Sequence, residues 1–490
     1  MSFMVSPPSS LVFMGQKRSH EIENDSAAWQ SIMELLKELC ERVLAPIFID
    51  IHDNWLMDKT MSEIKCDTSA VTVGDFTIQA ILHEIVKDYV RAFVGEEGKP
   101  NVSIRDVINT YSVAYRKNIN QFKTLIGQHT TVLRDASCFV DPIDGTAEYK
   151  ASKAQDGSTI CVGFADSSGT SIAGLIYKPI TSTDRDCTPI YAWGVYLGDT
   201  YKSIGLSHKP RTLDLAAQNV AWIGNLDGFE NKTIVETNLS AVSVLSPDSI
   251  NELPKATLRA ARVPFIKHMF DHGFVHMETL SDNQPTDIQM GGCGNKILHM
   301  VMDLPATQAR DQNFWGYVQM RNLQRWDTCA AEAILKANGG DLFKFYQFVD
   351  DAGEVISYKY KKDYTDGVNT DMIELQSYLD YAVDEKEWAV VKLDDAGLIK
   401  HKAGAHTYHM NEIQNTFRYH AGPEIVNKQI QRDADGTLIR KADTGKLNEH
   451  VNVFGLVAIA RKDDNKLHQL RNALRDFFEH GAVESKKIFT

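Results

Sequence analysis

The sequence lacks the features that mark disulfide scaffolds, zinc sites and membrane-spanning proteins. Its seven cysteines are scattered along 490 residues, with no CxxC or CxxH pair among them. An odd number of dispersed cysteines is typical of reduced thiols. No apolar run approaches the roughly 20 residues that a transmembrane helix needs. The largely apolar segment 10–14 is too short for a secretory signal and precedes the nearest basic residues. We therefore expect a cytoplasmic protein that does not bind membranes.

The chain also lacks an excess of positive charge. Its 52 basic and 65 acidic residues give a formal net charge of −13. Such a surface repels nucleic acids and anionic membranes, so we expect neither as a partner. A small anionic substrate would need metal ions or a few placed cations. The composition does not define an oligomeric state.

The length predicts more than one folding unit, because 490 residues are too many for one ordinary core. We expect two subdomains of α/β or α+β type. The expected divisions are a disordered tail at 1–27, an N-terminal subdomain at 28–185, a C-terminal subdomain at 186–490, and within it a charged, irregular insertion at about 343–445.

Local patterns predict several elements. Apolar residues recur at helical spacing from Trp29 to Val43, which predicts a helix that ends near Pro46. Apolar runs at 159–164 and 172–177 flank a turn and predict a β-hairpin.

One acidic stretch, Asp-Pro-Ile-Asp-Gly-Thr at 141–146, follows a short apolar run. Pro142 cannot continue a strand ladder, so the strand ends and the chain turns there. Asp141 and Asp144 then lie on one tight loop, where both carboxylates can face one concavity. Hard oxygen ligands of this kind suit Mg²⁺. Taken alone, the stretch fits an Asx-type turn before a helix equally well.

Further acidic residues occur where elements begin or end. Glu96 and Glu97 follow the apolar run 92–94, Asp75 lies near the start of a predicted helix, and Asp327 opens another. Asp327 by itself fits a helix N-cap. Together with 141–146, these residues indicate a multi-carboxylate site.

Three of these motifs, in this order, resemble the lithium-sensitive, metal-dependent phosphatases of the inositol monophosphatase superfamily. They are Gly-Glu-Glu at 95–97, Asp-Pro-Ile-Asp-Gly-Thr at 141–146, and Trp-Asp-x-x-Ala-Ala at 326–331. Residues 292–296 and 191–194 are most similar to the inositol polyphosphate 1-phosphatase branch. The resemblance implies an αβαβα layered sandwich, of α+β or α/β class, with the site between two subdomains.

The resemblance also implies roles for individual residues. Each site would hold two or three Mg²⁺ ions, bound by Glu96, Asp141, the carbonyl of Ile143, Asp144 and Asp327. Li⁺ would inhibit the enzyme. A water nucleophile would be activated by Thr146, Asp75 and Glu97. The substrate would contact Asp144, Gly145, Thr146, Gly292, Cys293, Lys296 and Arg321.

The implied reaction removes the 1-phosphate from inositol polyphosphates such as inositol 1,4-bisphosphate by metal-activated water. Gly145 and the stretch 72–76 are closer to the nucleotidase branch. A 3′(2′),5′-bisphosphate nucleotidase is therefore one alternative. A non-catalytic relative that binds inositol phosphates is another. A phosphatase with an Asp nucleophile in Asp-x-Asp-x-Thr is disfavoured, because the aspartates here are one residue further apart.

Overall fold

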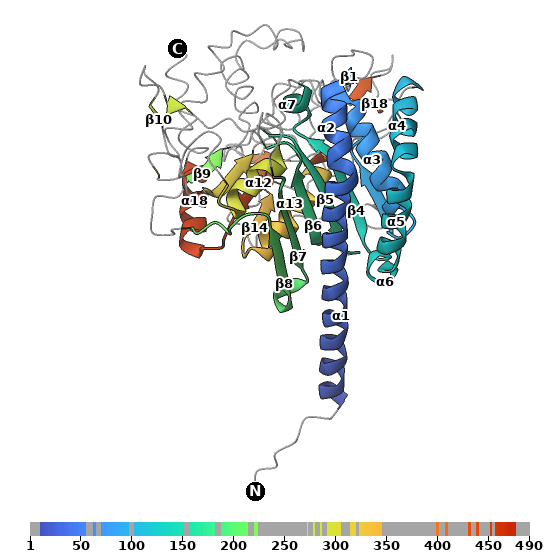
Figure 1. The fold of residues 1–490 in the computed structure, drawn as a ribbon. Coiled ribbons are helices and arrows are strands. Elements are labelled where there is room, and N and C mark those ends of the chain that lie inside the picture. The colour runs from blue at the N-terminus through green and yellow to red at the C-terminus, as the bar shows by residue number, and fades with distance from the viewer. Residues whose placement is uncertain are drawn as a thin grey trace.

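The computed structural model describes the protein as stacked layers of helices and sheets (Figure 1). The main described ranges are 10–54, 70–97, 102–150, 157–167, 169–181, 188–213, 292–304, 314–319, 323–344 and 456–476. Short described strands outside these ranges include β1 (Ser62–Ile64), β9 (Val220–Ile223), β10 (Glu278–Thr279), β11 (Pro285–Thr286) and β19 (Val451–Asn452).

A long helix, α1 (Ser10–Leu39), opens the fold and projects below the rest of the molecule in Figure 1. The prediction of a disordered tail through residue 27 is therefore wrong from Ser10 onward. The stretch from Ser10 to Ala45 contains no proline, so nothing in it interrupts the helical hydrogen bonds. Trp29 packs on Phe164 and anchors the helix to the sheet behind it.

The predicted helix end near Pro46 is also wrong, because the helical path continues through a π-helical turn, η1 (Cys40–Leu44), into α2 (Ala45–Asn54). In this turn the Ala45 N–H donates to the Cys40 carbonyl, five residues back. This wider turn changes the pattern of helical hydrogen bonds just before Pro46, which has no N–H to donate.

Six strands form the larger sheet, in the order β3-β4-β5-β6-β7-β8. The first pair is parallel and the others are antiparallel. Their bounds are β3 (Ala92–Gly95), β4 (Ser137–Asp144), β5 (Thr159–Ala165), β6 (Ser171–Lys178), β7 (Ile190–Tyr196) and β8 (Lys202–Leu206). The β5–β6 pair confirms the predicted hairpin. The sheet runs past the subdomain boundary predicted at residue 185, so the two sheets divide after Leu206.

One face of this sheet is covered by α1 and by α3, while α4 and α5 pack against α3. The helices on this side are α3 (Val73–Val86), α4 (Val102–Ala114), α5 (Arg116–Gly127), α6 (Thr130–Leu133) and the short α7 (Thr146–Lys150). A short strand, β2 (Ala70–Thr72), leads into α3 and pairs with β1.

The opposite face is covered by α13 (Arg325–Ala337), with α12 (Cys293–Val301) beside it. Three glycines lie side by side across β5, β6 and β7: Gly163, Gly174 and Gly194. A Cβ atom at Gly174 would lie 2.5 Å from the Cα atom of Ala330. The glycine row therefore lets the backbone of α13 lie directly on the sheet.

A smaller sheet, in the order β14-β20-β12-β9, follows beyond α13. It contains β14 (Asp341–Lys344), β20 (Leu456–Ile459) and β12 (Phe314–Gln319), and is followed by α18 (Asp464–Asp476). Leu470 and Ala473 of α18 are buried. The succession of helices, sheet, helices, sheet and helix confirms the predicted layered α/β sandwich.

Residues 343–445 are predicted as an insertion. Beyond the end of β14, the structure describes two short hairpins in this range. These are β15 (Leu398–Lys400) with β16 (Thr407–His409), and β17 (Ile430–Arg432) with β18 (Leu438–Arg440). The remainder, beyond β14, lies outside the described residues. Among the described helices, none combines the length and apolar character needed to cross a membrane.

Candidate functional site

Three carboxylates from distant parts of the chain meet at the end of β4, and we call them the acidic cluster: Glu96, Asp141 and Asp327. One oxygen of each lies within 4.8 Å of the others. Glu96 follows β3, and its N–H donates to the Val140 carbonyl at 3.2 Å, which sets it beside Asp141. Asp327 lies in the first turn of α13, which crosses the same sheet.

The electrostatics of the acidic cluster favour a cation. Burial raises the pKa of Asp141 well above its usual range, and the charges of Glu96, Asp327 and Asp144 raise this pKa further. Carboxylates this close repel one another unless a proton or a cation lies between them. An all-oxygen donor set is the kind that Mg²⁺ and Ca²⁺ bind, so the acidic cluster can hold a divalent metal ion.

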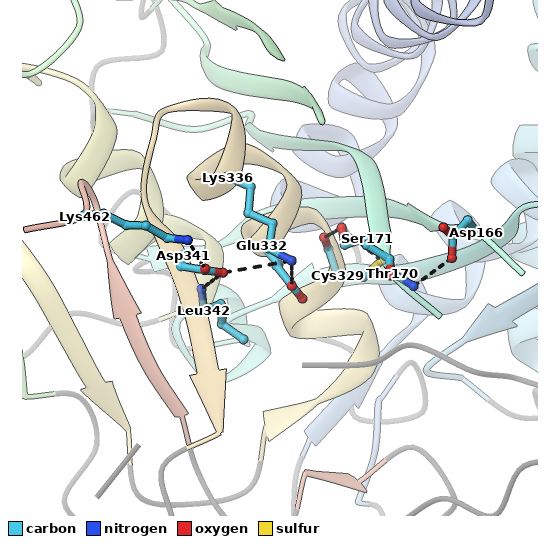
Figure 2. A network of polar contacts seen from close by, with 9 residues as sticks. All are labelled: Asp166, Thr170, Ser171, Cys329, Glu332, Lys336, Asp341, Leu342 and Lys462. Carbon is cyan, nitrogen blue, oxygen red and sulfur yellow. Dashed lines mark hydrogen bonds and ion pairs between the residues drawn. The ribbon is translucent and has the colours of Figure 1, made fainter. Parts of the chain in front are cut away.

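Helix α13, which carries Asp327, is held to its surroundings by the polar network in Figure 2. The Ser171 hydroxyl of β6 donates to the Cys329 carbonyl at 2.7 Å. Further along the helix, Lys336 forms an ion pair with the fully buried Glu332 and lies 4.0 Å from Asp341. Lys462 completes the network, 2.8 Å from the other oxygen of Asp341.

Asp144 is placed differently from the acidic cluster, although the sequence groups it with Asp141. Its Oδ1 accepts the Cys293 N–H at 2.9 Å, and its Oδ2 accepts the Gly294 N–H at 2.6 Å. The Thr159 hydroxyl donates to Oδ2 at 3.0 Å. Burial raises the pKa of Asp144, while these hydrogen bonds and Lys296 act to lower it. Asp144 thus joins β4 to the start of α12, an arrangement we call the α12 junction.

The two glycines at the α12 junction are needed for its geometry. Gly292 has a φ of 65°, and a Cβ atom on it would lie 2.3 Å from the Gly157 carbonyl. Gly145 has a φ of 86°, also in the left-handed region that favours glycine. The structure therefore brings Gly292 and Cys293, both predicted substrate contacts, against Asp144.

Thr146 and Asp75 meet as the resemblance predicts. The Thr146 hydroxyl lies 3.2 Å from Asp75 Oδ1 and 2.8 Å from the Ile143 carbonyl. Its single proton can serve only one of these acceptors at a time. Asp75 is buried, and its Oδ2 accepts the Thr72 N–H at 2.7 Å and the Thr72 hydroxyl at 2.6 Å. This capping box at the start of α3 fixes the carboxylate next to Thr146.

Glu97 is held through its backbone by a residue that the sequence reasoning did not assign to the site. Gln79 of α3 donates to the Glu97 carbonyl at 2.7 Å, and its Oε1 accepts the Glu97 N–H at 2.8 Å. A Cβ atom at Gly95 would lie 2.2 Å from the same side chain. Gln79 thus acts as a clamp that holds the Glu96–Glu97 turn against α3. No local sequence signal marks this long-range pairing.

Two predicted substrate contacts remain, Lys296 and Arg321. Lys296 is only 5% exposed, and its ammonium lies 3.4 Å from the Tyr317 hydroxyl and 5.0 Å from the centre of that ring. It therefore supplies buried positive charge close to Asp144, unlike a solvated surface lysine. Arg321 lies outside the described residues, so its predicted role stays a prediction.

Comparison with known proteins supports the family to which the motifs point. Residues 50–237 match the model of the Inositol monophosphatase family. Residues outside this range include Asp327 of the acidic cluster and the whole of α12.

Curated relatives match parts of the chain. The human Golgi-resident adenosine 3′,5′-bisphosphate 3′-phosphatase is 37% identical over 156 residues, covering 32% of this chain and 34% of that protein. Inositol monophosphatase 3 of Xenopus tropicalis is 22% identical over 275 residues, covering 56% and 59%. The rat 3′(2′),5′-bisphosphate nucleotidase 1 is 24% identical over 212 residues, covering 42% and 49%. The chain thus spans between a third and three fifths of the length of these relatives.

Solved structures superpose on this chain with low similarity. An IMPase/NADP phosphatase complexed with NADP and Ca²⁺ is 15% identical, with a TM-score of 0.38, covering 68% of this chain and 88% of that one. CysQ from Bacteroides thetaiotaomicron is 16% identical, with a TM-score of 0.35, covering 69% and 93%. The assignment of the fold rests on the sheet order and helix packing described above.

Proposed function

We propose that this chain is a magnesium-dependent phosphomonoesterase that hydrolyses a small bisphosphate by attack of water. One observation carries the proposal: three carboxylates from separate segments converge within 4.8 Å, at the end of the strand that leads into Thr146. The match of residues 50–237 to the Inositol monophosphatase family supports it.

The residues of the site fit the required metal ions. Glu96, Asp141 and Asp327 would hold Mg²⁺, with the Ile143 carbonyl and Asp144 as the further ligands that the motifs predict. Bound Mg²⁺ would lower the pKa of the attacking water and neutralise charge on the phosphate and leaving group. The converging carboxylates supply the hard oxygen donors that such an ion requires.

The chain's own groups would handle the proton of the water. The Thr146 oxygen can accept a hydrogen bond from water while its own proton is directed to Asp75, 3.2 Å away. The Thr72 capping box keeps that carboxylate in place. Glu97, whose backbone Gln79 holds, is the third residue assigned to this step.

Two substrates follow from different observations. The motifs at 292–296 and 191–194 favour an inositol polyphosphate, with removal of the 1-phosphate. The second candidate is adenosine 3′,5′-bisphosphate, since an adenosine 3′,5′-bisphosphate 3′-phosphatase and a 3′(2′),5′-bisphosphate nucleotidase share 37% and 24% identity with parts of this chain. The buried Lys296 beside Asp144 supplies a positive charge that could attract a phosphate group of either bisphosphate.

Phosphate release by the purified full chain tests the proposal. Inositol 1,4-bisphosphate and adenosine 3′,5′-bisphosphate would be compared at equal Mg²⁺, with and without a chelator. We expect Mg²⁺-dependent release, stopped by the chelator and inhibited by millimolar Li⁺. The larger kcat/KM identifies the substrate. Binding of a bisphosphate without release would instead support the non-catalytic alternative.

A further inference from the structure

Tyr149 lies three residues after Thr146, on the five-residue helix α7, and is fully buried. Its hydroxyl donates to the Phe48 carbonyl of α2 at 2.7 Å. Its ring meets Phe48 edge-on, with ring centres 4.5 Å apart, and lies 5.2 Å from His52. The side chain thus joins the segment that carries Thr146 to the N-terminal helices. No residue of these helices has a role in the proposed reaction.

The same hydroxyl also lies near the start of α3. A Cβ atom on Gly74 would lie 3.2 Å from the Tyr149 hydroxyl and 2.9 Å from Cδ1 of Ile143. Gly74 immediately precedes Asp75 in the first turn of α3. Tyr149 and Ile143 therefore flank the backbone that presents Asp75, while Thr146, on the same loop, faces the Asp75 carboxylate.

We propose that Tyr149 is a positioning residue that sets the distance between Thr146 and Asp75. A helix of one turn has little stability of its own, so α7 depends on tertiary contacts to hold its place. The Tyr149 hydroxyl ties α7 to α2 by its hydrogen bond and lies beside the turn that carries Asp75. This inference rests on the proposed function, in which the Thr146–Asp75 pair accepts the proton of the attacking water.

Tyr149→Phe removes only the hydroxyl, and Tyr177→Phe is the matched control. Tyr177 is also fully buried, and within the described structure its hydroxyl has no hydrogen-bond partner. Because a displacement of about 1 Å can reduce the rate up to about a hundredfold, we expect kcat to fall about tenfold in Tyr149→Phe. In this variant, KM and the Mg²⁺ half-saturation should stay within about twofold of the wild type. In Tyr177→Phe, kcat, KM and the Mg²⁺ half-saturation should all stay within that range.

A double-mutant cycle separates positioning from general loss of stability. If Tyr149 acts through Thr146, adding Tyr149→Phe to Thr146→Ala lowers kcat no further, because the group being positioned is already gone. A further tenfold loss in the double variant would overturn the proposal. An unchanged kcat in Tyr149→Phe would overturn it as well.

Hydrogen exchange of the α7 amides provides a readout that does not depend on turnover. We expect residues 146–150 to exchange faster in Tyr149→Phe than in the wild type, and not in Tyr177→Phe. If the wild type releases no phosphate from any bisphosphate, the proposed function fails. The exchange data still decide whether the hydroxyl holds α7, and equal exchange in all three proteins would reject that role.

Discussion

Asp141 in the acidic cluster faces two further carboxylates, whereas Asp144, three residues later, faces two backbone N–H groups at the start of α12. In the first surroundings burial, and after it the neighbouring negative charges, raise the pKa of Asp141 well above its usual range. In the second, the carboxylate charge is matched by N–H donors and by the hydroxyl of Thr159. The difference shows that Asp141 is placed where a cation could bind, while Asp144 joins two layers of the fold.

Asp141→Asn should give the largest effect, because it removes the central charge of the acidic cluster. Metal ions contribute several kcal/mol to charge stabilisation in such reactions, so we expect kcat to fall about a thousandfold or more. Folding without metal should be unharmed or improved, since the repulsion is relieved. Phosphate release and thermal unfolding in a chelator measure the two effects. Asp166→Asn, in a turn away from the site, is the control.

Asp144→Asn should reduce both activity and stability, unlike Asp141→Asn. One carboxylate oxygen becomes an NH₂ group, which cannot accept the N–H of Cys293 or Gly294. Disrupting a hydrogen bond to a buried charged group costs about 2–3 kcal/mol. Denaturant unfolding in a chelator measures this loss. If Asp144→Asn unfolds like the wild type, the α12 junction does not have the structural role given to it here.

Gly174→Ala tests whether the close packing of α13 positions Asp327. The new Cβ atom would overlap the backbone at Ala330, so the helix must move away from the sheet. Displacing a metal ligand through its support weakens metal affinity about 10–100-fold, and we expect the Mg²⁺ half-saturation to rise at the lower end of that range. Isothermal titration with Mg²⁺ measures the change directly.

Gly198→Ala serves as its control. That glycine has a φ of 74°, and a Cβ atom added to it would have nothing within 4 Å, so the variant suffers backbone strain without touching α13. Its Mg²⁺ half-saturation should match the wild type. An equal loss of affinity in both variants would attribute the effect to stability alone.

His299, on α12, should give the smallest effect. Burial, together with the charges of Lys178 and Arg211, lowers the pKa of His299 to about 3. Its contribution to stability is therefore complete above the unfolded-state pKa of about 6.5 and declines as the pH falls below it, because only the unfolded chain takes up the proton. Between pH 7.5 and 5.5 the wild type should lose about 1.4 kcal/mol more than His299→Gln. Denaturant unfolding at both pH values measures this, and an equal loss in both proteins would contradict it.

The presence of β4 could be predicted from the sequence because its signals are local, but its end was predicted wrongly. Pro142 predicts that the strand stops there, whereas β4 continues through it to Asp144, with an irregularity in its pairing with β5 between Asp141 and Asp144. The β5–β6 hairpin was equally visible for the same reason. The path of the N-terminal helices was not, because Pro46 predicts a helix end, whereas the π-helical turn before it lets the helix continue into α2. The clamp formed by Gln79 depends likewise on a contact between distant segments.

By itself, the sequence determined which residues are candidates for the site: the aspartates and threonine of 141–146, the glutamates after the apolar run 92–94, and Asp327 at a helix start. These are properties of residue type and short spacing. Tertiary structure alone decided their grouping, because pairing of β3 with β4 and the seating of α13 on three glycines bring Glu96 and Asp327 to Asp141. It also decided that Asp144 turns to α12, since the N–H groups that it accepts belong to a helix far along the chain.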